Sequence, residues 1–399
     1  MIYLFRLLII KTKDFTFQNL KFQHTFIADK NIEMLIKDIT NFLETIAPPS
    51  LQEDYDNAGL IIGDTNNVCT KVLISLDCTE AIVQEAIDKN CNLIIAHHPI
   101  VFKGLKKING KNYVERTIIK AIKNDIAIYA IHTNLDNVLH GVNGKIAEML
   151  GLQNVQILSP KKDLLKKLIV FSPMANVQKL TNALFAAGAG NIGNYSECSF
   201  SNVGTGTFTP GKNSNPQTGK IGTRETLNEI KIEVIYPEWL EHKILRTMKD
   251  NHPYEEVAHD IYNLNNAYRN TGSGIIGELA ISKNESELLK QIATIFKATV
   301  IKHTALLEKT CKTIAVCGGA GSLLIDNAKA AGADVYITSD VKYHEFFDAD
   351  GKILLADIGH FESEQFTIDL LFDLLSDKFP TFALLKTGIN TNPVQYFVP

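Results

Sequence analysis

The sequence predicts an α/β protein in which a mostly parallel sheet with flanking helices is interrupted by an α+β insert. Apolar strand-like runs alternate with helical segments up to residue 152 and again after residue 272, which is typical of parallel sheets covered by helices. The residues between follow a βαββαβ order, typical of a ferredoxin-like unit. A chain of 399 residues is also longer than a single hydrophobic core usually accommodates, so more than one domain is expected. We therefore expect an N-terminal extension at residues 1–33. Residues 34–159 and 273–399 should form the two halves of one composite domain, and residues 160–272 should form the insert.

The first α/β segment contains one leading helix and three strand–helix pairs. Apolar residues at helical spacing predict a helix over 35–46, which ends before Pro48 and Pro49. Short, continuous runs of branched apolar residues predict buried strands, because a parallel strand is covered on both faces. The predicted strands and the helices that follow them are 72–76 with 80–89, 93–96 with 114–123, and 127–131 with 142–150.

The insert has its own alternation and one long loop. Its predicted strands are 168–172, 195–200, 230–236 and 257–264, and its predicted helices are 176–187 and 238–251. Residues 204–222 are rich in Gly, Thr, Asn and Pro, which predicts a long mobile loop. The stretch His252-Pro-Tyr-Glu-Glu256 combines an imidazole with two carboxylates; such a motif can bind a metal but is more often structural.

The last segment returns to helices and strands. A helix is predicted over 285–296, and strands over 299–302 and 313–316. The second of these strands enters the glycine-rich run Cys317-Gly-Gly-Ala-Gly-Ser322. The backbone N–H groups of such a turn can cradle an anion, but the run matches neither a dinucleotide-binding fingerprint nor a P-loop. Tight turn geometry explains it equally well.

Two adjacent histidines, His97 and His98, stand where the predicted strand 93–96 ends, and Pro99 blocks its continuation. Ligands of open α/β sheets bind at the carboxyl ends of the strands, and imidazole is the commonest metal ligand. Other apolar runs also end in polar side chains, at Asp77, at His132 to Asp136, at Ser339 with Asp340, and at Gly359 with His360. If their strands are parallel neighbours, these side chains share one edge of one sheet, although an Asp after a strand also commonly caps the next helix.

The C-terminal motif Gly359-His-Phe-Glu-Ser-Glu364 adds a second pair of candidate ligands. The glycine lets the chain turn out of a strand, and His360 and Glu364 then share one face of the helix that begins there. Alone, this spacing is equally typical of a polar pair on a solvated helix. Together with the double histidine and Asp136, it indicates a metal site. Three imidazoles and two carboxylates suit Zn, Fe, Ni or Mn, and they are more ligands than one tetrahedral ion needs.

Together these motifs resemble those of the Nif-three-like family, whose members are often called GTP cyclohydrolase I type 2 homologs. The matching stretches begin near Met34 and follow the family's order. They are Tyr55-Asp-Asn-Ala-Gly-Leu60, Ser75-Leu-Asp-Cys-Thr79, Ala96-His-His-Pro99, His132-Thr-Asn-Leu-Asp136, Thr338-Ser-Asp-Val-Lys-Tyr-His344 and Gly359-His-Phe-Glu-Ser-Glu364. Tyr55 stands where the family often has Trp, so one aromatic side chain replaces another.

The resemblance implies a dinuclear site with two divalent metal ions per subunit. Carried over to this chain, the ligands would be His97, His98, Asp136, His360 and Glu364, with Glu364 bridging the ions. The resemblance also implies a homo-oligomer, commonly a ring-shaped hexamer, and an insert of the PII-like or CutA-like kind. It leaves the metal and the physiological reaction open.

Composition narrows the setting in which the protein works. A formal net charge of −4 gives no support to non-specific nucleic-acid binding, which needs a basic face. Six scattered cysteines without a Cys-x-x-Cys motif are typical of reduced thiols in a cytoplasmic protein. Residues 2–10 are apolar but interrupted by Arg6, and they are too short to span a bilayer. Because the motifs begin near Met34, we expect residues 1–33 to be a dispensable extension; a cleaved signal or a membrane anchor is the alternative.

The first functional hypothesis is a metal-dependent hydrolase that acts on a nucleotide or another small molecule. Two neighbouring ions lower the pKa of a bridging water and hold it as hydroxide, which a GTP cyclohydrolase would use to open the purine imidazole ring. Asp340, Tyr343 and His344 are candidates for orienting substrate or moving protons. Asp77 and Asn57 are candidates for fixing the ligating histidines, with capping or packing as the alternative. A noncatalytic metal-binding scaffold or regulator acting through the insert is the second hypothesis, and a phosphoester hydrolase is the third.

Overall fold

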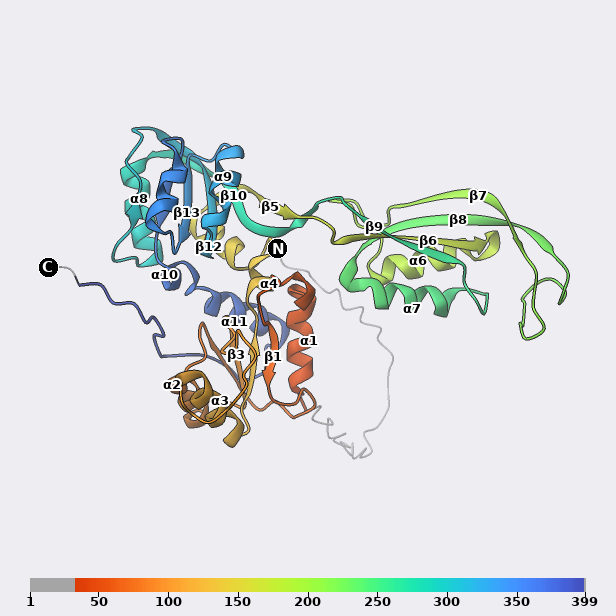
Figure 1. The fold of residues 1–399 in the computed structure, drawn as a ribbon, viewed down its shortest axis with the longest axis horizontal. Coiled ribbons are helices and arrows are strands. Elements are labelled where there is room, and N and C mark those ends of the chain that lie inside the picture. The colour runs from red at the N-terminus through yellow and green to blue at the C-terminus, as the bar shows by residue number, and fades with distance from the viewer. Residues whose placement is uncertain (1–32, 398–399) are drawn as a thin grey trace, which may run out of the picture. The chain divides into compact units, whose positions relative to one another are not determined.

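The computed structural model describes residues 33–397, so the predicted extension at residues 1–33 lies outside the described residues apart from Glu33. The described chain contains three sheets, of five, six and four strands (Figure 1). Among these residues, no helix is both long and apolar enough to cross a bilayer. All six cysteines are free thiols, as their scattered spacing predicts.

The five-stranded sheet has the order β1-β4-β3-β2-β15, and only β1 runs antiparallel to its neighbour. Its strands and the helices of the same segment are β1 (Gly59–Ile62), β2 (Val72–Ser75), β3 (Leu93–Ala96), β4 (Ala127–Ala130), β15 (Leu384–Lys386), α1 (Ile36–Ile46), α2 (Glu80–Asp88), α3 (Tyr113–Lys123), α4 (Thr133–Asp136) and α5 (Val142–Leu150). Successive side chains of a strand point to opposite faces. Ile74 and Ile95 therefore pack with α1, whereas Leu73 and Ile94 pack with α2 and α3. Burial on both faces explains why these strands are apolar at nearly every position.

The six-stranded sheet has the order β11-β14-β13-β12-β10-β5, in which only β12, β13 and β14 are mutually parallel. Its strands and the helices of the last segment are β5 (Leu152–Lys161), β10 (Tyr268–Asn284), β11 (Lys302–His303), β12 (Thr310–Ala320), β13 (Val335–Ser339), β14 (Leu354–Asp357), α8 (Glu285–Phe296), α9 (Ile325–Ala330), α10 (His360–Glu364) and α11 (Thr367–Lys378). The polar strand ends do not all share one sheet: those after β2, β3 and β4 belong to the first sheet, and those after β13 and β14 belong to the second. The antiparallel strands β10 and β11 occupy both edges of the parallel group, so the first sheet cannot join it.

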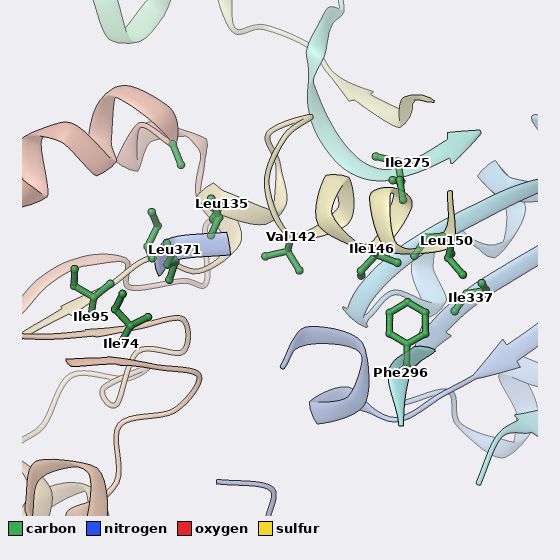
Figure 2. Packing of buried hydrophobic residues seen from close by; sticks show 14 of the residues in the cluster. Ile74, Ile95, Leu135, Val142, Ile146, Leu150, Ile275, Phe296, Ile337 and Leu371 are labelled. Carbon is green, nitrogen blue, oxygen red and sulfur yellow. The ribbon is translucent and has the colours of Figure 1, made fainter. Parts of the chain in front are cut away.

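One hydrophobic cluster joins the two sheets. Figure 2 shows Val142, Ile146 and Leu150 of α5, whose four-residue spacing places them on one helical face. Leu371 of α11, which packs on the first sheet, and Ile337 of β13 in the second sheet belong to the same cluster. The two segments that the insert separates in sequence therefore share one hydrophobic core.

The insert has the predicted βαββαβ order. Its elements are β6 (Leu165–Pro173), α6 (Val177–Ala187), β7 (Ser199–Phe208), β8 (Glu225–Pro237), α7 (Glu241–Asn251) and β9 (His259–Leu264). The four strands form an antiparallel sheet in the order β7-β8-β6-β9. Leu168, Ile232, Leu184 and Ile244 belong to a separate hydrophobic cluster between this sheet and its two helices. The insert thus has its own core, and its likeness to PII-like proteins stays a prediction.

Two features of the insert differ from or refine the sequence interpretation. Part of the predicted loop at 204–222 is strand, because β7 pairs with β8 as far as Phe208 through backbone bonds that need no apolar side chain. His252 has a structural role: its Nε2 donates to the Phe171 carbonyl at 2.9 Å, and its Nδ1 accepts from the Tyr254 N–H at 3.1 Å. Both ring nitrogens of His252 are therefore occupied by the protein itself.

Candidate metal centre

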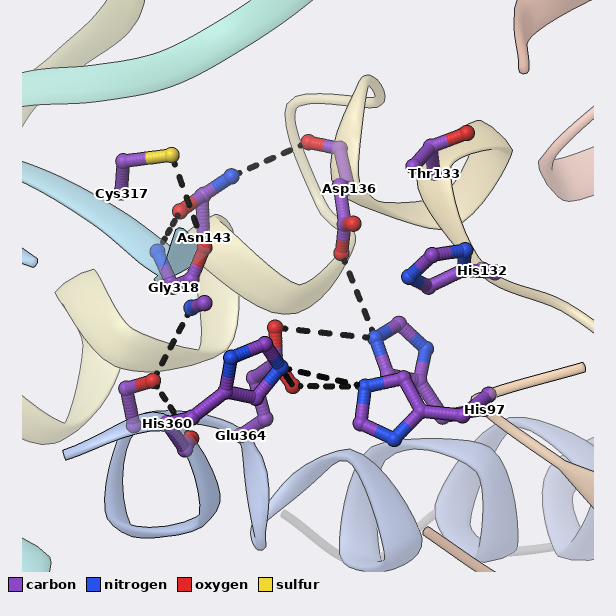
Figure 3. Close-up of polar contacts among 12 residues, drawn as sticks. His97, His132, Thr133, Asp136, Asn143, Cys317, Gly318, His360 and Glu364 are labelled. Atoms are coloured by element: carbon purple, nitrogen blue, oxygen red, sulfur yellow. Dashed lines mark hydrogen bonds and ion pairs between the residues drawn. The ribbon is translucent and has the colours of Figure 1, made fainter. Parts of the chain in front are cut away.

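The carboxyl ends of strands from both sheets meet at one cluster of imidazole and carboxylate side chains (Figure 3). His97 and His98 follow β3, and His132 follows β4. From the other sheet, His360 and Glu364 are the first and last residues of α10, which comes after β14. His98 Nε2 lies 3.0 Å from Glu364 Oε2, although the two residues are 266 positions apart. The cluster therefore lies between the two segments of the chain that share a core.

All four histidines of the cluster use Nδ1 to donate a hydrogen bond to a fixed oxygen. The acceptors are the Ile131 carbonyl for His97 (2.8 Å), Asp77 Oδ1 for His98 (2.8 Å), Asp56 Oδ1 for His132 (2.8 Å) and Asp340 Oδ2 for His360 (2.6 Å). Because these oxygens only accept, Nδ1 carries a proton in each ring. Nε2 is then the nitrogen able to bind a metal ion, which is how metal-ligating histidines are usually oriented.

Glu364 lies at the centre of the cluster, with 3% of its side chain exposed. Its Oε2 lies 3.0 Å from Nε2 of both His98 and His360, and its Oε1 lies 3.9 Å from His97 Nε2. Burial raises the pKa of the Glu364 carboxyl, but the adjacent His360 and His98 hold it well below its usual range. Burial also lowers the pKa of the two imidazoles, yet the carboxylates beside them raise that of His98 to about 9 and that of His360 to about 11. Without a metal ion, protons on these imidazoles balance the charge of Glu364.

His97 and Asp136 form the part of the cluster that lacks such compensation. His97 is fully buried, and its Nε2 has no hydrogen-bond partner among residues 33–397. Asp136 Oδ1, which lies 3.6 Å away, is buried and has no partner in the described chain either. Burial lowers the pKa of His97 to about 3 and raises that of Asp136 well above its usual range. An unpaired buried polar atom costs about 1–3 kcal/mol, and a cation shared by these two atoms would satisfy both, so the site fits a metal ion.

Three overlapping sets of side chains offer ligand atoms that lie within 4.8 Å of one another. The sets are His97 with His98 and His132, His98 with His360 and Glu364, and His97 with Asp136 and Glu364. Imidazole nitrogen and carboxylate oxygen are donors that suit divalent Zn, Fe, Ni or Mn.

The glycine-rich end of β12 packs directly against this cluster. Gly319 has a φ of +64°, and a Cβ added there would overlap Glu364 Oε1, so a glycine is needed for this close approach. The Gly318 N–H donates to Asn143 Oδ1 at 2.8 Å, and the Gly319 N–H donates to Ser363 Oγ at 3.0 Å. Because both N–H groups are used within the protein, this part of the run supports the close packing and is not an anion cradle.

The cluster opens into a cavity of about 1020 Å³. Tyr55 and Phe102 line it, and the Phe102 ring stands edge-on to His132 with 5.6 Å between ring centroids. Residues 391–394 near the C-terminus form part of the wall. Among them, Thr391 donates from Oγ1 to Asp77 Oδ2 at 2.5 Å. The end of the chain therefore supports the carboxylate that orients one of the histidines, and the cavity has the size of a small-molecule site.

Residues 34–393 match the Duf34/NIF3 (NGG1p interacting factor 3) family. The chain belongs to this family. A Halalkalibacterium halodurans protein named GTP cyclohydrolase 1 type 2 homolog is 39% identical over 364 residues, covering 90% of this chain and 98% of that protein. A Bacillus subtilis protein of the same name is 36% identical over 369 residues, with 90% and 98% covered. The solved structure of a Bacillus cereus protein related to NIF3 matches with a TM-score of 0.79 and 37% identity, covering 91% of this chain and 99% of that one.

In this member of the Duf34/NIF3 family, the five side chains expected as ligands lie together. They are His97, His98, Asp136, His360 and Glu364, each of which belongs to at least one of the three sets. Asp77 orients His98, as its position after a strand suggested. Asn57 makes no hydrogen bond to a histidine among residues 33–397; its Nδ2 donates to the Val101 carbonyl at 2.7 Å and so supports the segment after the double histidine.

The three residues expected to orient substrate or move protons are placed differently from one another. Asp340 lines the cavity and accepts a hydrogen bond from His360, so it orients a candidate ligand. Tyr343 and His344 lie in the 3-10 helix η5 (Tyr343–Ala349), where both are exposed and neither lines the cavity. Asp340 has a φ of +55°, which turns the chain at the end of β13. A role for Tyr343 and His344 in orienting substrate within one chain finds no support in this arrangement.

Two side chains of the candidate centre in this Duf34/NIF3 protein were not identified as such from the sequence. His132 contributes the fourth imidazole, and Asp56 holds its Nδ1. The signal for His132 was present, because it follows a buried strand in the same way as His97 and begins the motif that ends in Asp136. Asp56 lies in the motif that begins at Tyr55, but no spacing rule connects it to a histidine 76 positions away.

Proposed function

We propose that this protein binds two divalent metal ions in the histidine–carboxylate cluster and acts as a metal-dependent hydrolase. The observation that carries the proposal is the buried pair of His97 Nε2 and Asp136 Oδ1, which lie 3.6 Å apart with no hydrogen-bond partner in the described chain. A purely structural cluster would pair these atoms, since buried polar groups are normally satisfied. The fixed Nδ1 protons of all four histidines support the same conclusion.

The two oxygens of Glu364 support a bridging position for this carboxylate. Oε2 faces the Nε2 atoms of His98 and His360, whereas Oε1 faces Nε2 of His97. One ion would then be held by His98, His360 and Glu364, and the other by His97, Asp136 and Glu364. His132 lies close enough to His97 and His98 to complete the coordination. Zn, Fe, Ni and Mn all remain candidates, because the donors are of borderline softness.

The chain's own residues would prepare the site for hydrolysis. Two bound ions would supply Lewis acidity toward a substrate oxygen and lower the pKa of water. Asp77, Asp340 and Asp56 hold the rings of His98, His360 and His132 so that each Nε2 is ready to bind. Phe102 and residues 391–394 form part of the cavity wall beside the cluster. Because the relatives are named GTP cyclohydrolase 1 type 2 homolog, a nucleotide or a related small molecule is the proposed substrate.

Elemental analysis of the full-length protein after gentle purification tests the metal site. We expect close to two divalent ions per chain. The double variant His97→Ala with Glu364→Ala should lose most of the metal, because it removes a ligand from each position. His303→Ala is the control, since His303 is exposed and its Nδ1 contacts the adjacent Thr304 carbonyl. A reproducible metal content near zero in the wild-type protein would refute the proposal.

Turnover of GTP and of phosphoesters by metal-loaded protein tests the reaction. Glu364→Gln keeps the size of the side chain but removes its charge, so it should reduce kcat more than it raises KM. Activity that persists in metal-free protein would show that another site or a contaminant is responsible. If metal-loaded protein turns over neither class of substrate, the protein is better described as a metal-binding scaffold or regulator.

A further inference from the structure

The segment between β3 and α3 carries a dense positive charge. Residues 103–111, which we call the lysine loop, contain Lys103, Lys106, Lys107 and Lys111 and no acidic residue. All four side chains are exposed, and the structure shows no ion pair between them and any residue from 33 to 397. Uncompensated charge of this density in a protein of net charge −4 attracts anions.

The residues on either side of the lysine loop line the metal-centre cavity. Phe102, immediately before it, and Tyr113, two residues after it, both line the cavity. Phe102 packs against the His132 ring, and Asn57 donates to the Val101 carbonyl at 2.7 Å, so the entry to the loop is fixed beside the candidate ligands. Both ends of the lysine loop therefore border the wall of the cavity.

A buried carboxylate fixes the far end of the lysine loop. Glu115, of which 8% is exposed, accepts from the backbone N–H groups of Asn109 and Lys111 at 3.0 Å each and from Asn112 Nδ2 at 2.9 Å. These bonds hold the pKa of Glu115 below its usual range. The carboxylate thus orders the backbone and leaves the lysine side chains unpaired. A loop ordered in advance loses less conformational entropy when it binds a ligand.

The interior of the cavity has the opposite character. Among its described lining residues, Lys302 is the single lysine or arginine, and its Nζ lies 2.5 Å from Asp357 Oδ2. Asp340 and Glu362 add further negative charge to the lining. The protonated imidazoles of the lining are already balanced by adjacent carboxylates. Apart from bound metal ions, the cavity therefore offers little free positive charge to a phosphate chain, whereas the lysine loop that borders its wall does.

We propose that the lysine loop binds the phosphate end of a small phosphorylated substrate while the reacting end of the same molecule enters the cavity. The assignment of the reacting end rests on the proposed function; the binding of phosphate by the loop does not. Ammonium groups donate to phosphate oxygens as charge-assisted hydrogen bonds. The aromatic rings of Phe102 and Tyr113, which flank the loop, would contact the uncharged middle of the molecule.

Calorimetric binding of GTP, inorganic triphosphate and guanosine to the full-length, metal-loaded protein tests the proposal. The loop variant is Lys103/Lys106/Lys107→Gln. Its charge-matched control is Lys123/Lys290/Lys309→Gln, which replaces three exposed lysines that form no ion pair in the described chain. In the loop variant, the affinity for GTP and for triphosphate should fall at least about tenfold, as expected for the loss of several charge–phosphate contacts. Guanosine should bind as before, and the salt dependence of GTP binding should weaken. The control should match the wild type.

Several results would overturn the proposal. These are equal losses of GTP and guanosine affinity, equal losses in both triple variants, and a wild-type protein that binds neither GTP nor triphosphate. A loop variant that loses affinity for a single-stranded oligonucleotide but not for GTP would assign the loop to nucleic acid instead. Metal content is measured on the same samples. A wild-type protein without metal would contradict the proposed function. Triphosphate binding would still test the phosphate-binding role of the lysine loop, because the loop contains no candidate metal ligand.

Discussion

Replacing Gly319 by alanine should weaken metal binding through one added methyl group. The built Cβ overlaps Glu364 Oε1 and lies 3.3 Å from Glu364 Cδ and 3.5 Å from His360 Cε1. The carboxylate must therefore move away from the position in which it faces three imidazoles. Gly351 provides a matched control, because its φ of +59° is close to the +64° of Gly319 and an added Cβ there meets nothing within 4 Å.

The comparison of the two variants separates backbone strain from displacement of the carboxylate. A left-handed backbone costs an L-residue about 1–2 kcal/mol, and this loss of stability should be common to Gly319→Ala and Gly351→Ala. Only Gly319→Ala also disturbs the hydrogen bonds of Glu364 to His98 and His360, each worth about 1.5–3 kcal/mol because a charged group takes part. Disturbance of a group that supports a metal site typically lowers metal affinity about 10–100-fold.

Competition with a chromophoric chelator measures the affinity, and chemical denaturation in excess chelator measures the stability of the metal-free protein. We expect Gly351→Ala to lose stability but to keep wild-type metal affinity, and Gly319→Ala to lose at least about tenfold in affinity. Equal metal affinities in the two variants would refute the reasoning, since the contact with Glu364 would then have no effect on binding.

Three further predictions address the support of the site, its protonation and the insert. Thr391→Val should speed metal release about 10-fold or more by removing the bond to Asp77, whereas Thr391→Ser should behave as wild type in a chelator-trapping assay. The raised pKa values of His98 and His360 stabilise the metal-free fold fully below about pH 6.5, and this contribution should be lost as pH rises through about 9 and then about 11. Metal affinity should rise over the same pH range, because the ion displaces these protons. Denaturation and metal titrations at a series of pH values test both trends, and a metal affinity that falls with rising pH would contradict the assignment. Residues 160–272, expressed alone, should unfold cooperatively in calorimetry and bind no metal pair; a disordered fragment would contradict the separate core.

The sequence predicted the elements of the fold better than their pairing. Continuous apolar runs such as 72–76 and 93–96 mark buried strands because burial on two faces excludes polar side chains, and these strands are present. The same pattern does not say which strands pair, so the division into two sheets was not predicted. Residues 204–208 were missed as strand because an exposed edge strand places no demand on apolar side chains.

The candidate ligands were predictable to the extent that they follow strands or share a helical face. His97, His98 and Glu364 meet one of these conditions, and the structure brings them together. Tyr343 and His344 lie in a matching motif, but sequence proximity to Asp340 does not give the direction of the chain after its left-handed turn. The contact of Asp56 with His132 depends on the packing of distant segments, which no local pattern encodes.

The separation of the candidate ligands along the chain has a consequence for protein synthesis. His98 and Glu364 are 266 positions apart, and translation at roughly 5–20 residues per second takes about 15–50 s to add that many residues. For most of this interval the nascent chain carries His97, His98 and His132 but not Glu364. A complete cluster can therefore form only after translation of nearly the whole chain, and a ribosome that stops before residue 360 would release a protein that lacks His360 and Glu364.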